Sequence, residues 1–448
     1  MGTFIEAING YLWGFPMIAF LFFIHILMTV KTRFIQRKVF YGVRLSLKRS
    51  DGCEEGISPF SALATSLAST LGTGNIIGVS TAVVMGGAGA VFWCWITGIL
   101  GMATQYCECF LSVKYREKKS AAEFSGGPMY VLKNGAGSKT LGVLYASLAA
   151  LGGLITGAAI QTNAISDVIK GSVKENGINL SARGEFLLLF GVGSVVAFIV
   201  SAVIFGGLKS VSKLCSMVVP FMAAAYVFGC VLILFINRSY LAESVKLIAS
   251  EAFSFKSAAG GISGSAFMLS CRYGISRGLF SNEAGIGTSS VICAGAKTRS
   301  SHFQGLISMT ATFWDTVVMC LITGVTVVST LVASDAQASD FKGAELCYRA
   351  FSQIPHFGRG MLLFSIVAFA ISTVLGWSVI GEKCVTFIFG GKGEKVYRLM
   401  WVLAVFLSAF VSLEGVWALG DFINALLVIP NVTGLLLLSN EIASQNKI

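Results

Sequence analysis

A chain of 448 residues that is 55% hydrophobic and only 12% charged is not an ordinary soluble protein, because soluble domains carry about a quarter charged residues. Lipid must serve as the solvent for its apolar surface. The net charge of +11 does not indicate a nucleic-acid partner, since the basic residues lie in short loops between apolar runs and are not interleaved with aromatic residues.

Eleven apolar runs are candidates for membrane-spanning helices, because about 20 residues cross the hydrocarbon core. We interpret the first run as a retained helix, since no basic segment precedes it and no small-residue cleavage site follows it. The other ten runs form two blocks of five, within 58–236 and 259–438. The expected spans are 10–30, 58–86, 90–113, 140–169, 184–206, 214–236, 259–296, 304–331, 360–389, 399–412 and 417–438.

The basic residues predict an orientation for these spans. With the amino terminus outside, the inside loops and carboxyl-terminal tail hold 21 Lys and Arg residues and the outside loops hold nine. Because basic loops stay on the cytoplasmic side, the sequence predicts an N-out/C-in arrangement. No loop is long enough for a soluble domain, so we expect residues 1–448 to form a single transmembrane domain that binds its ligands inside the helix bundle.

The second and seventh spans are interrupted by glycine. The second breaks at Gly72-Thr73-Gly74-Asn75, and the seventh contains Gly274, Gly278 and the run from Ser281 to Gly287. Each glycine costs a helix interior about 1 kcal/mol, and freed backbone groups in lipid must find partners. Breaks in the first helix of two oppositely oriented five-span blocks are typical of secondary transporters.

The chemistry of a broken helix favours an amino acid as cargo. The half-helix after the break offers N–H groups and a positive dipole end to a carboxylate, and the half-helix before it offers carbonyls to a cation such as Na⁺. The glycines could instead serve only close packing. Thr73 and Asn75 beside them are more than packing requires, so we expect a small neutral amino acid carried with a cation.

Four motifs, in order along nearly the whole chain, resemble the alanine/glycine:cation symporter family. They are Leu71-Gly72-Thr73-Gly74-Asn75-Ile76, Gly126-Gly127-Pro128-Met129-Tyr130, the run from Arg277 to Gly285, and Gly376-Trp377-Ser378 followed by Gly381-Glu382-Lys383-Cys384. The resemblance implies an all-α membrane protein with a leucine-transporter-like 5+5 inverted repeat preceded by one extra helix. It also implies uptake of alanine or glycine with Na⁺, less often H⁺, across the plasma membrane of a bacterium or archaeon.

The resemblance further implies the positions of the binding residues. The first, third and eighth core helices are expected to line the substrate pocket with Thr73, Gly74, Asn75, Gln161, Ile165 and Trp377. Two backbone carbonyls and two hydroxyl groups are expected to bind Na⁺: those of Ala68, Leu71, Ser372 and Thr373. The chain departs from the family pattern after Gly285, where Ile286-Gly287-Thr288-Ser289-Ser290 stands in place of Leu-Gly-Ser-Ala-Pro.

Ionisable and polar residues inside the spans are candidates for gating or coupling, because they are costly to bury in a membrane. Arg277 and Glu283 could face a cavity, pair as an inner gate, or form a structural ion pair. Asp315 could bind a cation, relay a proton or make structural hydrogen bonds. Asn282 belongs to the same motif as Glu283, whereas we interpret Glu108 as structural.

Other classes of protein fit the sequence less well. The eleven cysteines lie mostly in apolar runs without a CxxC pair, which predicts packing rather than a metal site or disulfides. An ion channel needs a repeated filter or a symmetric pore, and an intramembrane enzyme needs a nucleophile–base set, two catalytic carboxylates or an H-E-x-x-H motif. The sequence shows none of these. A glutamine- or serine-preferring transporter, or an H⁺-coupled one, is the closer alternative.

Overall fold

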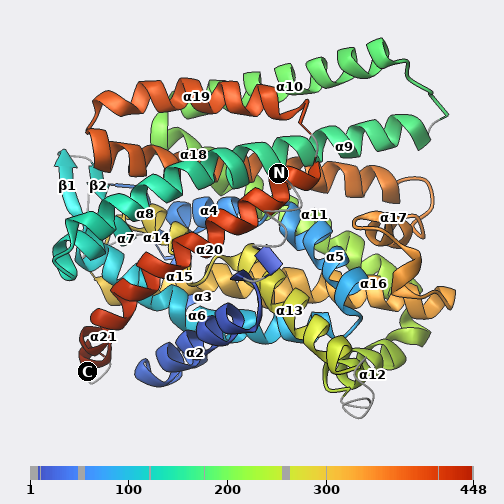
Figure 1. The fold of residues 1–448 in the computed structure, drawn as a ribbon, viewed down its shortest axis with the longest axis horizontal. Helices are drawn as coiled ribbons and strands as arrows, with labels where there is room; N and C mark the ends of the chain where they lie inside the picture. The colour runs from blue at the N-terminus through green and yellow to red at the C-terminus, as the bar shows by residue number, and fades with distance from the viewer. Residues whose placement is uncertain are drawn as a thin grey trace.

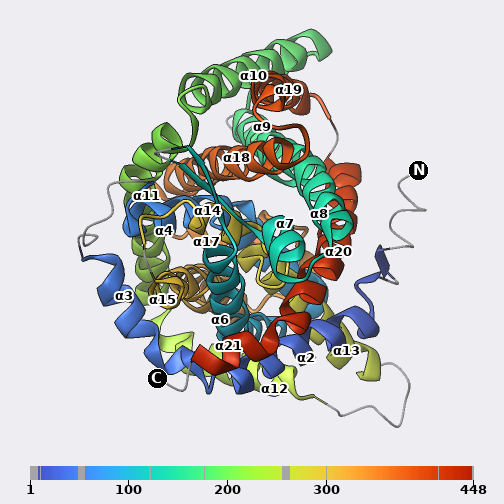
Figure 2. The same cartoon turned by 90° about the vertical axis from the view of Figure 1, so that its left-hand side faces the viewer.

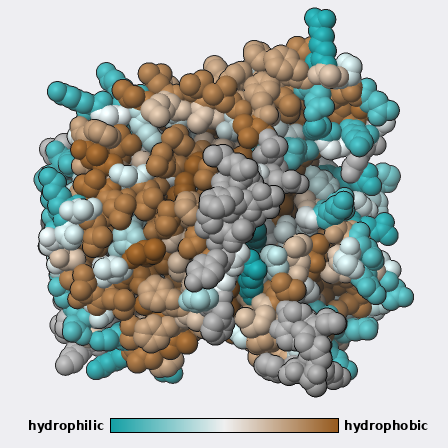
Figure 3. All heavy atoms as spheres, viewed as in Figure 1, coloured by the Kyte–Doolittle hydropathy of each residue, from teal (hydrophilic) through white to brown (hydrophobic). Residues whose placement is uncertain are grey.

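The computed structural model describes residues 9–445 apart from 11, 49–55, 121–122, 176, 255–262, 299 and 412, and it is mostly helical (Figure 1). In this part of the chain, six helices are long and apolar enough to cross a membrane, or eight if each bent pair counts as one span. Figure 3 shows a broad hydrophobic face with hydrophilic residues gathered along its left and right edges. Such a surface is expected of a bundle whose sides face lipid.

Within the described residues, helices overlap each of the eleven expected ranges, but the count of eleven membrane crossings stays a prediction. The first half of the chain contains α2 (Phe15–Lys31), α3 (Val39–Ser46), α4 (Pro59–Thr70), α5 (Val79–Gly86), α6 (Ala90–Lys114), α7 (Pro128–Tyr130), α8 (Lys139–Gly152), α9 (Ile160–Glu175), α10 (Ala182–Ile204), α11 (Gly207–Ile236) and α12 (Leu241–Ala252). The second half contains α13 (Ser263–Asn282), α14 (Thr288–Cys293), α15 (Ser301–Thr312), α16 (Leu321–Ser334), α17 (Glu345–Phe351), α18 (Gly358–Phe389), α19 (Lys392–Ser408), α20 (Leu413–Leu437) and α21 (Ser439–Gln445).

The connections add elements that the sequence analysis did not predict. A two-stranded antiparallel hairpin, β1 (Glu117–Ser120) and β2 (Glu123–Ser125), follows α6. In Figure 1 this hairpin and α21 lie at one end of the bundle, while α12, α17 and the connection from α9 to α10 lie at the other. These are the two groups of loops that the count of basic residues assigns to opposite sides.

The first interrupted helix has clear local causes. Ser58 caps α4 by accepting the N–H of Ser61 at 3.0 Å, and Pro59 occupies the first helical position. After the helix ends at Thr70, a π-helical turn over Gly74–Gly78 leads into α5, and the two halves meet at a bend of 53°. Further π-helical turns at Gly153–Ala159 and Phe313–Cys320 interrupt the long helices that contain α9 and α16. Such turns frequently occur at functional sites.

The second interrupted helix breaks later than its first glycines indicate. Gly274 and Gly278 lie inside the continuous helix α13, where they permit close packing on α6. A Cβ at Gly274 would lie 2.4 Å from the carbonyl oxygen of Ala90, and one at Gly278 would lie 3.2 Å from that of Cys94. The break itself follows Asn282. Viewed along the bundle, α4 and α14 lie toward its centre, enclosed by α6, α8, α11, α15, α18 and α20 (Figure 2).

Candidate substrate and cation site

The first break redirects two backbone N–H groups. That of Gly72 donates to Asn75 Oδ1 at 3.0 Å, and that of Thr73 donates to Gln161 Oε1 at 3.3 Å. The Thr73 hydroxyl reaches the same Gln161 oxygen at 3.1 Å. In a continuous helix these N–H groups would point to the carbonyls of Ala68 and Ser69. The break therefore brings Thr73 and Gln161 together and interrupts the helical hydrogen bonds of the preceding carbonyls.

Helix α18 meets the carbonyl side of the same break. The Thr373 hydroxyl lies 3.2 Å from the carbonyl oxygen of Leu71 and 3.0 Å from that of Phe369. Ser372 is next to it and bonds to Phe369 within its own helix at 2.8 Å. Ala68, one turn before the break, is fully buried. Of the four expected Na⁺ ligands, the structure thus places Leu71 and Thr373 in direct contact.

Glycines on α18 and on the helix before α9 allow this close approach. A Cβ at Gly376 would lie 2.6 Å from the backbone nitrogen of Ser69, so α18 packs directly on α4. A Cβ at Gly157 would lie 2.3 Å from Cβ of Trp377. Trp377 and Ile165 are both 1% exposed. The two expected pocket residues are therefore held in the packed centre of the bundle.

A buried polar network joins the two breaks. Asn75 Nδ2 donates to Asp315 Oδ1 at 2.8 Å and to Ser281 Oγ at 2.9 Å. Asp315 Oδ2 accepts from Ser281 at 2.8 Å and from the Thr316 hydroxyl at 2.6 Å. Asn282 Nδ2 in turn donates to Thr316 at 3.1 Å. These side chains are at most 1% exposed, and every described donor to the Asp315 carboxylate is a neutral group.

The second break turns through left-handed backbone. Glu283 has φ +56°, followed by Gly285 at +97° and Gly287 at +85°. Trp377 Nε1 donates to Glu283 Oε1 at 3.0 Å, and the Thr288 hydroxyl donates to Oε2 of the same carboxylate. Thr288 replaces the serine of the family pattern and keeps its hydroxyl. The eighth core helix is thus tied to the second break through Trp377.

The pair of Arg277 and Glu283 that the sequence analysis considered is not formed. Arg277 Nη1 lies 3.7 Å from Asp421 Oδ1 of α20, and the guanidinium lies 5.3 Å from the centre of the Trp417 ring. Helix α13 is continuous to Asn282, and Arg277 and Glu283 are six residues apart. At 3.6 residues per turn, their side chains therefore point about 120° apart around the helix axis. Arg277 instead lines a cavity of the bundle.

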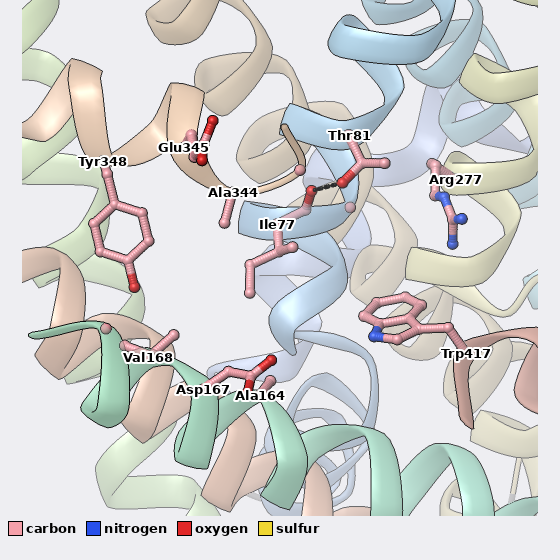
Figure 4. Close-up of a pocket in the computed structure, with 13 residues that line it drawn as sticks. Ile77, Thr81, Ala164, Asp167, Val168, Arg277, Ala344, Glu345, Tyr348 and Trp417 are labelled. Atoms are coloured by element: carbon pink, nitrogen blue, oxygen red, sulfur yellow. Dashed lines mark hydrogen bonds between the residues drawn. The ribbon is translucent and has the colours of Figure 1, made fainter. Parts of the chain in front are cut away.

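That cavity, of about 440 Å³, opens beside the first break. Figure 4 shows the Arg277 side chain lying over Trp417 on one wall, with Asp167 and Tyr348 on the others. Ile77 lines it two residues after Asn75, and Ala164 lines it directly before Ile165. The cavity is therefore a vestibule next to the expected substrate residues, at the end of the bundle that carries α17.

Sequence reasoning missed several of these partners. Asp421 was overlooked, although an acidic residue within the expected span 417–438 is itself a signal. Ser281 was visible in its motif but had no assigned role. Thr316 stands directly after Asp315 but had no assigned role. Asn431 gives no sequence signal, because its contact with Glu108 depends on how distant helices pack.

Two helices broken at the centre of a membrane bundle, with polar groups converging on both breaks, define a secondary transporter. The fold is leucine-transporter-like. Among solved structures, the crystal structure of MhsT in complex with L-phenylalanine matches with a TM-score of 0.61 at 15% identity, over 86% of this chain and 89% of that one. The model of the sodium:alanine symporter family matches residues 1–447, and the chain belongs to that family.

Relatives within the family differ in what their names say they carry. The sodium/alanine symporter AgcS of Methanococcus maripaludis is 39% identical over 99% of this chain and 96% of its own length. The putative sodium/proton-dependent alanine carrier YrbD of Bacillus subtilis is 31% identical over 98% of this chain and 90% of its own length. The probable sodium/glutamine symporter GlnT of Bacillus subtilis is 30% identical over 97% of this chain and 87% of its own length.

Proposed function

We propose that the chain is a Na⁺-coupled symporter that takes up alanine, glycine or both across the plasma membrane of a prokaryote by alternating access. The observation that carries this proposal is the break at Gly72–Asn75. Its N–H side contacts Gln161 of α9 and its carbonyl side contacts Thr373 of α18. One break thus offers donors for a carboxylate beside oxygens for a cation. The name of the relative AgcS supports both alanine and Na⁺.

The donor side of the break is suited to the carboxylate of an amino acid. A carboxylate arriving there takes the position of Gln161 Oε1 on the N–H and hydroxyl of Thr73 and releases Gln161 to bond the amino group. The dipole of the following half-helix favours the negative charge. A Cβ at Gly74 would lie 3.3 Å from the Phe280 ring. Phe280, Ile165 and Trp377 are bulky buried side chains near the break, which supports a small cargo such as alanine or glycine over glutamine.

The acceptor side of the break is suited to Na⁺. The carbonyls of Ala68 and Leu71 and the hydroxyls of Ser372 and Thr373 are hard oxygen donors, which Na⁺ prefers. Thr373 already spans from α18 to the Leu71 carbonyl at 3.2 Å. An ion held at this point ties α18 to the first broken helix, so its release allows the two to separate.

Asp315 and Arg277 are proposed to couple binding to movement. A buried carboxylate that receives only neutral donors needs a cation or a proton nearby, so Asp315 is the group through which H⁺ coupling, the alternative mechanism, would act. Arg277 lines the vestibule and lies 3.7 Å from Asp421 of α20. Separation of this pair would open the path from the vestibule to the first break. Asn282 and Glu283 hold the second break in place during that step.

The topology that accompanies this function has eleven spans, with the amino terminus outside and the carboxyl terminus inside. We propose that 1–448 form one transporter domain in which 58–236 and 259–438 are inverted repeats after one extra helix. The separation of the two groups of loops at opposite ends of Figure 1 supports this arrangement. The vestibule beside α17 then faces outward.

Uptake into proteoliposomes tests the proposal. Purified protein is supplied with labelled alanine, glycine, serine or glutamine under Na⁺, Li⁺, K⁺ or H⁺ gradients. We expect a Na⁺ gradient to drive accumulation of alanine or glycine. Preferential accumulation of glutamine or serine would contradict the proposed cargo of alanine or glycine. Accumulation driven only by an H⁺ gradient would contradict Na⁺ as the coupling ion. Uptake that ignores every gradient would refute symport.

A further inference from the structure

The end of α13 and the turn that follows it meet three buried carboxyl groups, through Ser281, Glu283 and Gly285. Ser281 donates to Asp315, Glu283 carries its own carboxyl, and the N–H of Gly285 donates to Glu108. All three carboxyl groups are at most 3% exposed. The role proposed above uses Asp315 and Glu283, but Glu108 of α6 has no part in it.

Glu108 has one satisfied oxygen and one unpartnered oxygen. Its Oε1 accepts the N–H of Gly285 at 2.8 Å and Nδ2 of Asn431 at 2.6 Å. Asn431 also donates to the Gly285 carbonyl at 2.9 Å, so α6, the second break and α20 meet at this one oxygen. Within the described part of the chain, Glu108 Oε2 is buried without a hydrogen-bond partner.

Among the described residues, no hydrogen-bond donor to Glu108 carries a positive charge. Its described donors are a backbone N–H and a side-chain amide, both neutral. The titratable groups that interact with it electrostatically include Cys107 and Cys109 on its own helix, Tyr145 of α8 and Glu283 of the break. The His25 ring of α2 would lie 3.9 Å from a Cβ at Gly285 and bonds at 2.7 Å to Thr104, one turn before Glu108 on α6. None of these side chains bonds to Glu108 in the described structure.

A proton fits this site better than a metal ion does. Glu108 lines a cavity of about 10 Å³ together with Pro128, Ser290 and Asn431, which is no larger than about one water molecule needs. No group of three or more His, Cys, Asp or Glu side chains suited to a metal ion occurs among the described residues. The donors on Oε1 present their positive ends, which also disfavours a cation. An ionised carboxylate in such a site is costly unless it is paired.

We propose that Glu108 is a proton-binding site of the transporter, which carries its proton on Oε2 and holds the second break closed through Oε1. Opening of the break withdraws the Gly285 N–H and Asn431 and admits water from the end of the bundle that carries the hairpin. The neutral acid then loses its proton to that side. This coupling rests on the proposed function, whereas the protonation of Glu108 in the closed protein does not.

Infrared spectroscopy of the purified, substrate-free protein tests protonation directly, because a neutral carboxyl group has a C=O band that a carboxylate lacks. At neutral pH we expect Glu108→Gln to remove one such band. The matched control is Glu382→Gln, because Arg398 donates to the Glu382 carboxylate through two 2.7 Å hydrogen bonds and keeps it ionised. This control variant should remove no band of a neutral carboxyl group. An unchanged carboxylic-acid region in Glu108→Gln would overturn the proposal.

A second variant guards against poor folding of Glu108→Gln. The second variant is Glu283→Gln, labelled with ¹³C at the side-chain carboxyl groups of its glutamates. Its spectrum should keep an isotope-shifted C=O band of a neutral carboxyl group, which is assigned to Glu108. Complete loss of that band would show Glu108 to be ionised and would also overturn the proposal. Neither readout requires transport, so failure of the symport proposal remains a separate result.

The coupling step has its own measurement. In proteoliposomes, alanine uptake by the wild type should change with the pH on the side that carries the hairpin. Uptake by Glu108→Gln should lose that pH dependence. The amide oxygen of the glutamine can still accept the hydrogen bonds that Oε1 of Glu108 accepts. Equal pH profiles for the two proteins would limit Glu108 to positioning Gly285 and Asn431.

Discussion

The amide of Asn75 donates to both the carboxylate Oδ1 of Asp315, at 2.8 Å, and the backbone carbonyl of the same residue, at 3.1 Å. The two residues are 240 positions apart in the chain. Because Asn75 Oδ1 also accepts the N–H of Gly72, one side chain shapes the first break and fastens it to the helix that carries Asp315. Any change in the charge or position of Asp315 therefore reaches the break directly.

Replacement of Asn75 by alanine should reduce alanine uptake at least tenfold. Hydrogen bonds to charged groups are worth about 1.5–3 kcal/mol, and about 1.4 kcal/mol corresponds to a factor of ten. The measurement is initial uptake in proteoliposomes at matched protein density. Asn134→Ala is the control, because Asn134 also donates two hydrogen bonds but lies at the exposed hairpin end. Wild-type uptake by Asn75→Ala would exclude this residue from the site.

The hydroxyl groups on α18 should set the affinity for Na⁺. We expect Thr373→Val to raise the Na⁺ concentration for half-maximal uptake about tenfold, since it removes one ligand while keeping the shape, at about 1.4 kcal/mol. Thr373→Ser should stay near wild type. Thr386→Val removes a hydroxyl from the same helix that donates to the backbone carbonyl of Glu382 at 2.8 Å, and serves as the control. If the double variant Ser372→Ala, Thr373→Ala keeps the wild-type Na⁺ dependence, these hydroxyls are not ligands.

The positions of the long helices followed from sequence because the length and composition of an apolar run are local properties. The first break was located correctly for the same reason, as glycine, threonine and asparagine stand together at Gly72–Asn75. The second break was placed less well. Gly274 and Gly278 look like helix interruptions in sequence, but they are packing glycines against Ala90 and Cys94 of α6.

The partners of the site residues were mostly beyond sequence reasoning. The contact of Arg277 with Asp421 joins α13 to α20 and depends on how the helices pack, whereas Glu283 was the nearest acidic residue in sequence. Glu108 was interpreted as structural because its sequence neighbours offered no partner. Its contacts come from Gly285 and Asn431, which lie 177 and 323 positions away. The hairpin after α6 was missed because two short polar strands have no apolar pattern.

The indole of Trp377 should matter through its N–H as well as its size. Trp377→Phe removes the 3.0 Å hydrogen bond to Glu283 and leaves a buried carboxyl oxygen without that donor. Leaving a buried acceptor unsatisfied costs about 1–3 kcal/mol. We expect uptake to fall about tenfold. Trp401→Phe is a matched control, because Trp401 is equally buried and its Nε1 has no partner in the described structure. Similar uptake by the two variants would assign Trp377 to packing alone.

The pair of Arg277 and Asp421 should act as one unit in transport. We expect Arg277→Gln and Asp421→Asn each to lower alanine uptake several-fold, and the double variant to be no worse than either, because contacting residues are not additive. The control cycle uses Lys133→Met and Glu117→Gln at the hairpin end, where the pair is about one-third exposed and 2.7 Å apart. Exposed pairs contribute about 0–1 kcal/mol, so these changes should leave uptake near wild type. A double Arg277, Asp421 variant whose loss equals the product of the two single losses would show that the pair does not gate the vestibule.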